Sequence, residues 1–145
     1  MAVWVLPCML AGCGGDWGDS HPGQPVTQRR ALFRKIAGVT EQMSLVLRDR
    51  KDYDPREFAH NASELHALST APWAHFPPGS DYSPSHARPT VWTQADDFRK
   101  HQQDFEDATA QLDVAASAHD MARIRSAHDA VIRSCRACHE VFHRG

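Results

Sequence analysis

The sequence lacks the features that tie a protein to nucleic acid, to nucleotides or to the interior of a membrane. Its 145 residues hold 16 Lys and Arg against 18 Asp and Glu, so no positive excess favours nucleic acid. No glycine-rich phosphate loop of the P-loop or dinucleotide-binding kind occurs. No apolar run reaches the ~18 residues that a transmembrane helix needs. The length fits one domain that can bury a core.

Cysteine is also scarce. The four cysteines fall into two distant pairs, Cys8 with Cys13 and Cys135 with Cys138. Their wide separation and different surroundings argue against a disulfide framework. Histidine, by contrast, is abundant: the ten residues follow no zinc-finger spacing, and most are expected on solvated helix faces.

The N-terminal segment predicts export. Residues 1–13 (MAVWVLPCMLAGC) are apolar and uncharged, and their end, Leu10 to Cys13, resembles the lipobox of bacterial lipoproteins. That resemblance implies cleavage before Cys13 and lipidation of its thiol, which anchors a protein to a membrane without spanning it. The basic residues that usually begin a signal are missing. Residues 14–27, rich in Gly, Pro and Asp, are expected to form a flexible tether to a domain over 28–145.

Apolar residues then recur with the period of a helix. The first predicted helix begins after Thr27, and its inner face consists of Leu32, Ile36, Val39, Met43 and Val46. The second is predicted to begin with Asp54 as N-cap and Pro55 at the first position, with Glu57 closing a capping box.

A crossover of residues 71–92 separates the second and third predicted helices. It holds five prolines, and a loop of this length is usually functional or packed by its own side chains. The third helix is predicted to follow Thr93 as N-cap, and the fourth to begin near Asp120. No segment alternates apolar and polar residues as a strand does. The sequence therefore predicts an all-α fold, an antiparallel four-helix bundle with a long crossover loop between helices 2 and 3.

The last predicted helix carries the motif with the strongest chemical content. Cys135-Arg136-Ala137-Cys138-His139 is a C-x-x-C-H sequence, which is typical of covalent haem c attachment. Positions i and i+3 lie on one side of a helix, so both thiols can join the vinyl groups of one porphyrin. His139 is then the axial ligand of the iron. Two other interpretations are weaker. A redox dithiol favours a βαβ setting, which this sequence does not predict. A zinc site needs ligands beyond the nearby His143.

These residues resemble the cytochrome c′ family over roughly residues 28–144. Besides the C-terminal C-x-x-C-H, the resemblance rests on Ala71-Pro72-Trp73 after the second helix and on Arg88-Pro89-x-x-Trp92 before the third. It implies a four-helix bundle with one covalently bound haem c.

The resemblance also implies the surroundings of the iron. Most members hold it five-coordinate and high-spin, and apolar residues of the first helix crowd the open side, which binds nitric oxide and carbon monoxide. Phe33 and Ile36 match that distal pocket. Low-spin relatives place a Met on this helix, but Met43 lies ten residues beyond Phe33, about 15 Å away along a helix. The residues implied at the haem periphery are Arg29, Trp73 and Arg88.

One position departs from the family pattern. Many members have an Arg four residues after the axial His, whereas this chain has His143 there, followed by Arg144. His143 is therefore expected on the proximal side of the haem, where a family Arg stabilises a displaced nitric oxide ligand.

The function implied is that of a periplasmic c-type cytochrome, not a conventional enzyme, that transfers electrons, binds nitric oxide and carbon monoxide, or does both. Two alternatives stay open: a low-spin, six-coordinate electron carrier of the same fold, and a gas sensor. The expected partners are small redox proteins and diatomic gases, with no nucleic acid. A homodimer through the first helix would use Val39, Leu45 and Leu47, and a lipid on Cys13 would attach the protein to the membrane.

Overall fold

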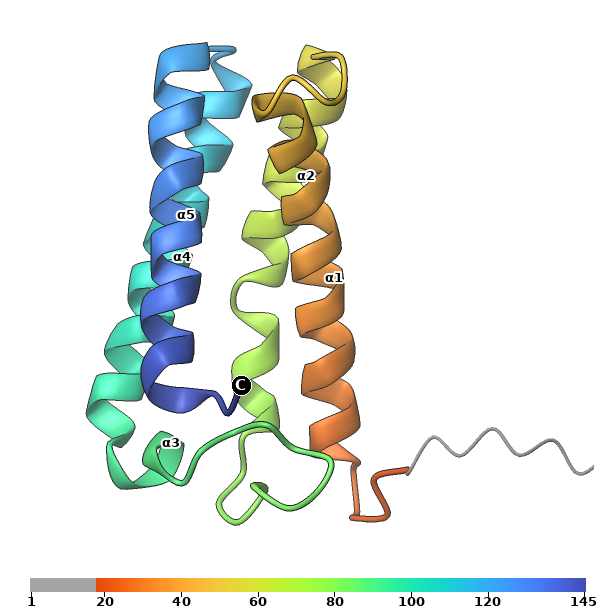
Figure 1. The fold of residues 1–145 in the computed structure, drawn as a ribbon, viewed down its shortest axis with the longest axis vertical. Helices are drawn as coiled ribbons and strands as arrows, with labels where there is room; N and C mark the ends of the chain where they lie inside the picture. Colours follow the sequence, from red (N-terminus) through yellow and green to blue (C-terminus); the bar gives the residue numbers. More distant parts are fainter. Residues whose placement is uncertain (1–17) are drawn as a thin grey trace, which may run out of the picture.

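Four long helices run alternately up and down in the computed structural model, which describes residues 18–145 (Figure 1). Between the second and third of them the chain crosses one end of the bundle, next to the start of the first and the end of the last. The elements are α1 (Pro25–Leu47), α2 (Pro55–Leu68), the 3-10 helix η1 (Ala71–His75), the short α3 (Thr90–Thr93), α4 (Ala95–Ser117) and α5 (Met121–Phe142). The predicted all-α, antiparallel four-helix bundle with a long crossover is confirmed.

Helix starts follow local signals at two places. The Asp54 carboxylate accepts hydrogen bonds from the backbone N–H groups of Arg56 (2.8 Å) and Glu57 (3.2 Å), as an N-cap does. The reciprocal half of the predicted capping box is absent, because the Glu57 carboxylate pairs with Lys51 instead. Asp120 caps α5 by accepting from the backbone N–H of Arg123 at 3.1 Å.

The predicted start of the third long helix is wrong. Thr93 is the last residue of α3 and does not cap α4, because its hydroxyl donates to the Pro89 carbonyl at 3.3 Å. Helix α4 begins at Ala95 after Gln94, whose side chain makes no capping bond. The predicted crossover is therefore partly helical, containing η1 at one end and most of α3 at the other.

The first helix begins earlier than the predicted boundary, and Asp19, which precedes it, forms hydrogen bonds with the start of the helix and with the crossover. Helix α1 takes up residues 25–27 of the predicted tether. Asp19 is only 3% exposed. Its carboxylate accepts from the backbone N–H of Val26 (2.9 Å) and from the Tyr82 hydroxyl (2.8 Å) in the crossover. The predicted segment 1–13 and Cys13 lie outside the described residues.

The core lies along the bundle axis in two parts. The main core cluster joins the four long helices through Ile36, Met43, Phe58, Ala62, Leu65, Phe105, Ala108, Leu112, Ala115, Ala116, Ile124, Ala127 and Val131. An end cluster beneath the crossover consists of Ala87, Val91, Phe98 and Phe142, with Trp73, Phe76, Trp92, Cys138 and Val141 packed on it. No helix of the described residues is long and apolar enough to span a bilayer.

Candidate haem-attachment site

The two thiols of the C-x-x-C-H motif lie on the inner side of the last turns of α5. Cys135 packs on the main core cluster and Cys138 on the end cluster, and both are half-buried. Their i, i+3 spacing keeps them on one side of the helix, as predicted. His139 is the next residue. It is exposed at the helix end, but partial desolvation of its imidazole lowers the pKa, which favours the neutral form that binds metals.

The thiols are not suited to act as thiolates. Burial raises the pKa of Cys135 above its ordinary value. Burial, followed by the neighbouring Cys135, raises the pKa of Cys138 to about 11. Reactive redox cysteines have lowered pKa values instead. Among the described residues, no three His, Cys, Asp or Glu side chains converge on a point that could hold a metal ion.

Aromatic side chains from α1, η1, α4 and α5 gather beside the motif. The ring of Phe33 on α1 lies 5.8 Å from that of Trp73 on η1 and 6.4 Å from that of Phe76, between centroids. The Phe98 ring on α4 lies 5.2 Å from Phe76 and 5.0 Å from Phe142. A flat, apolar cofactor held by α5 would therefore meet aromatic surface.

The two residues implied at the distal side, Phe33 and Ile36, differ in burial. Ile36 is 5% exposed and belongs to the main core cluster, whereas Phe33 is only partly buried and packs at its edge. Met43, also on α1, is completely buried. It lies ten residues after Phe33, near the Leu47 end of α1.

Arg29, implied at the haem periphery, is buried rather than solvated. Its guanidinium donates to the His75 carbonyl (2.9 Å), to the Ser80 hydroxyl (2.8 Å) and carbonyl, and to the Ser85 hydroxyl (2.6 Å). It also lies 4.5 Å above the ring of Phe76. Burial lowers the pKa of Arg29 from its ordinary value, but a guanidinium keeps its charge in proteins. Arg29 therefore ties α1 to the crossover.

The other two peripheral residues hold the crossover and the helices together. The Trp73 indole N–H donates to the Glu106 carboxylate at 2.8 Å. The Arg88 guanidinium donates to the Glu140 carbonyl at 3.2 Å, and the Arg88 backbone N–H donates to the Phe142 carbonyl at 2.9 Å. Arg88 thereby donates hydrogen bonds to carbonyls in the last turn of α5, which have no partner within the helix.

Three imidazoles form a column at the end of α5. The rings of His139 and His143 are stacked with centroids 4.9 Å apart, and His143 stacks on His86 of the crossover at 5.3 Å with 9° between the ring planes. An isolated antiparallel bridge between Ala87 and His143 holds the column in register. Burial lowers the pKa of His143, with His139 and His86 as further causes.

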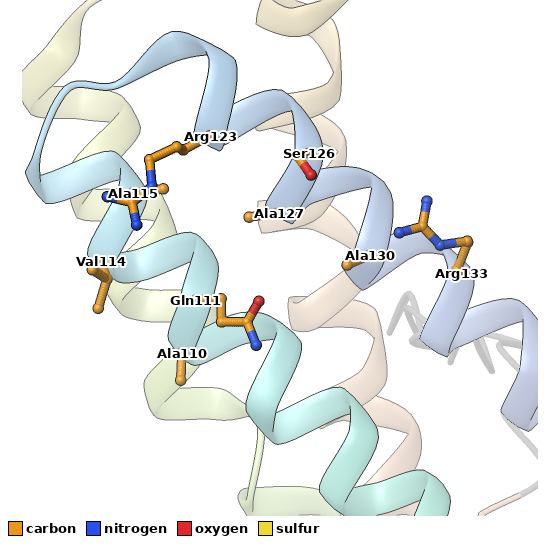
Figure 2. A pocket seen from close by; sticks show the side chains of 9 residues that line it. All are labelled: Ala110, Gln111, Val114, Ala115, Arg123, Ser126, Ala127, Ala130 and Arg133. Carbon is orange, nitrogen blue, oxygen red and sulfur yellow. The ribbon is translucent and has the colours of Figure 1, made fainter.

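Sequence reasoning missed His86 and Asp19. Each contacts a residue more than 50 positions away, His143 for His86 and Tyr82 for Asp19, and neither lies in a motif or on a periodic face. A surface groove of about 590 Å³ between α4 and α5 was also not foreseen (Figure 2). It includes none of the motif residues; its lining is Ala110, Gln111, Val114, Ala115, Arg123, Ser126, Ala127, Ala130 and Arg133.

The donor set fits haem c. Two half-buried thiols lie on one side of α5, an imidazole with a lowered pKa is adjacent, and apolar side chains from α1, η1 and α4 face the same region. Thioether attachment and axial ligation by His need this combination.

Comparisons with known proteins agree with a haem c site. The sequence profile of the Cytochrome C′ family matches residues 24–143. A cytochrome c′ from Alcaligenes xylosoxydans xylosoxydans is 33% identical over 125 residues, which cover 86% of this chain and 97% of that protein.

Solved structures show the same fold. The cytochrome c′ of Shewanella frigidimarina has a TM-score of 0.84 at 31% identity, covering 87% of this chain and 98% of that one. A nitric oxide complex of a mutant cytochrome c′ from Alcaligenes xylosoxidans has a TM-score of 0.80 at 32% identity, with the same coverage. The chain therefore belongs to the cytochrome c′ family, and its cofactor is one covalently attached haem c.

Proposed function

We propose that Cys135 and Cys138 attach the haem, that His139 is the single protein ligand of the iron, and that the opposite side binds small neutral diatomic gases such as nitric oxide and carbon monoxide. Haem c supplies an iron that changes between Fe(II) and Fe(III) and has an axial position for a ligand. The observation that carries the proposal is the C-x-x-C-H motif on the inner side of α5, beside the aromatic side chains of α1 and η1.

The lack of a second protein ligand on α1 supports the five-coordinate state. Helix α1 contains no histidine, and its one methionine, Met43, lies about 15 Å from Phe33 along the helix. Met121, at the start of α5, is 18 residues from His139, about 27 Å along that helix. These distances disfavour the low-spin alternative.

Phe33 and Ile36 are proposed to form the distal wall. Their side chains carry no hydrogen-bonding group, so they exclude water and disfavour charged ligands, while a small neutral gas meets no comparable cost. The relative solved with nitric oxide bound belongs to the same family and has the same fold. Arg29, Trp73 and Arg88 are proposed at the haem periphery, and His143 on the proximal side.

Binding and electron exchange, rather than catalysis, are the proposed activities. The iron can still accept and give electrons while one axial position is open, so small redox proteins are proposed partners beside the gases. We place the protein in the periplasm, because haem attachment signals and an export-like N-terminus occur together in this sequence. The lipobox-like end of that segment supports a lipid anchor on Cys13.

Self-association through α1 is proposed for the face opposite the core. Leu45 is only half-buried, so part of its side chain is open to a second copy of α1. It lies near the Leu47 end of the helix, away from Arg30 and Arg34. Val39 and Leu47 pack on the main core cluster, which leaves them less surface for a partner than the sequence suggests.

The visible spectrum of the holoprotein tests the proposed coordination. The reduced protein is expected to have a broad high-spin spectrum that shifts sharply when carbon monoxide is added. A sharp, split low-spin spectrum that carbon monoxide leaves unchanged would mean a sixth protein ligand and would overturn the gas-binding proposal. Recording the same spectra for Phe33→Leu controls for general disturbance, because Leu keeps the distal wall apolar.

A further inference from the structure

The two ends of the bundle differ in charge. The crossover end, from the middle of each long helix to the crossover, consists of residues 18–36, 65–106 and 132–145 and holds ten Lys and Arg against seven Asp and Glu. The far end, residues 37–64 and 107–131, holds six against ten. With neutral histidines the net charges are +3 and −4. The two propionates of haem c would lower the first to about +1 without reversing the difference.

Several positive side chains of the crossover end are exposed and make no ion pair with another described residue. Arg30, Arg34 and Lys35 on α1 and Arg133 and Arg136 on α5 are exposed, and in the part of the chain that the structure describes none of them forms an ion pair. The Lys and Arg that do form ion pairs at this end both lie on α4. Unpaired arginines suit contacts with phosphate groups, which they bind through two N–H donors.

The N-terminal segment leads to the same end. Asp19 is fixed to the start of α1 and to the crossover through Val26 and Tyr82. Six peptide links separate it from Cys13, so the fully extended chain between them spans about 20 Å at most. Helix α1, with 23 residues, is about 35 Å long. A lipid on Cys13 would therefore keep the crossover end, and not the far end, close to the membrane.

We propose that the crossover end of the bundle docks on an anionic lipid surface, with Arg30, Arg34 and Arg136 facing the phosphate headgroups. Permanent attachment of the protein to the membrane rests on the lipidation of Cys13 proposed above. The contact between the arginines and the headgroups does not depend on that lipid. The docked orientation brings the haem side of α1 and α5 to the membrane and turns the negative far end toward the solvent. Electron partners in or on the membrane are then closer to the haem than they would be if the far end faced the membrane.

Vesicle binding tests the charge contact without the lipid. The holoprotein with Cys13→Ser, exported behind a cleavable non-lipoprotein signal, is mixed at low salt with vesicles of phosphatidylglycerol or of phosphatidylcholine. The haem absorbance of the sediment measures the bound fraction. Binding is expected only to phosphatidylglycerol, and added salt should release it because the charges are screened.

Matched charge reversals locate the contact. Arg30→Glu with Arg34→Glu is expected to lower the partition coefficient at least about 25-fold, since each basic residue near an anionic surface contributes about fivefold. Arg50→Glu with Arg56→Glu changes two exposed arginines at the far end that pair with no described carboxylate, and should change the partition coefficient less than about twofold.

Three results would overturn the docking: equal binding to both kinds of vesicle, no binding to either, or equal losses in both variant pairs. Binding to polyglutamate without binding to vesicles would assign the crossover end to an acidic protein instead. The mass of the Cys13 peptide from native protein tests the anchor separately. Vesicle binding without acyl chains on Cys13 would leave the docking standing and refute the anchor, and the reverse result would refute the docking alone.

Discussion

Arg29→Met should destabilise the protein far more than its position in a helix suggests. The substitution keeps the apolar stem of the side chain but removes the charged group that binds Ser80, Ser85 and the His75 carbonyl. Because Arg29 is 3% exposed and Ser80 is 2% exposed, water does not replace the lost donors freely.

The size of the effect follows from these contacts. Each acceptor left unsatisfied costs about 1–3 kcal/mol. Removal of the buried charge offsets part of this, because the guanidinium no longer has to be desolvated. A net loss of about 3 kcal/mol in the free energy of unfolding is expected, which lowers Tm by about 10 °C for a domain of this size.

Guanidinium denaturation of the holoprotein, followed by far-ultraviolet circular dichroism, measures the loss. Arg30→Met is the matched control, because Arg30 is the next residue of α1 and is exposed; it should change stability by less than about 0.5 kcal/mol. If Arg29→Met unfolds within about 1 kcal/mol of the parent, the reasoning that Arg29 holds the crossover to α1 is refuted.

Three further predictions concern pH and the haem. Burial lowers the pKa of His128, so the folded protein binds the proton less well than the unfolded chain; stability should be fully present above pH ~6.5 and fall as the pH drops below it, and urea titrations of His128→Gln should show a smaller fall. An unchanged pH dependence would contradict this. Cys135→Ala should retain haem through Cys138 alone, with a red-shifted pyridine haemochrome spectrum, and attachment that is lost completely would contradict two independent thioether bonds. Phe33→Met should supply a thioether to the distal side and abolish the response of the reduced spectrum to carbon monoxide, whereas Phe33→Leu should keep it.

Features that depend on neighbouring residues could be predicted from the sequence. The Asp54-Pro55 start of α2 and the Asp120 start of α5 follow from capping by the residue itself. The apolar period of the last helix placed both cysteines on the inner side, and the structure agrees. The start of α4 was mispredicted because Thr93 has a second use for its hydroxyl within α3. Its competing bond with Pro89 is also local, but a threonine before a helix gives no sign of which bond it will make.

Long-range polar contacts could not be predicted. Arg29 finds its acceptors 46 to 56 residues away, and Asp19 finds Tyr82 63 residues away. No period or motif announces such pairs, because the crossover that carries the partners has an irregular backbone. His128 illustrates the same limit: it was expected among solvated histidines, yet it is 6% exposed and meets the Ser44 hydroxyl at 3.0 Å across the bundle.

The crossover contacts both helices of the proposed haem site, α1 and α5, through separate interactions. It holds α1, which carries Phe33, through Arg29, and it holds the end of α5 through the bridge between Ala87 and His143. Since η1 and the residues after it also supply Trp73 and Phe76 to the aromatic surface, a change in the crossover should alter both sides together. The crossover therefore fixes the end of α5, which carries His139, relative to α1, which carries the proposed distal wall.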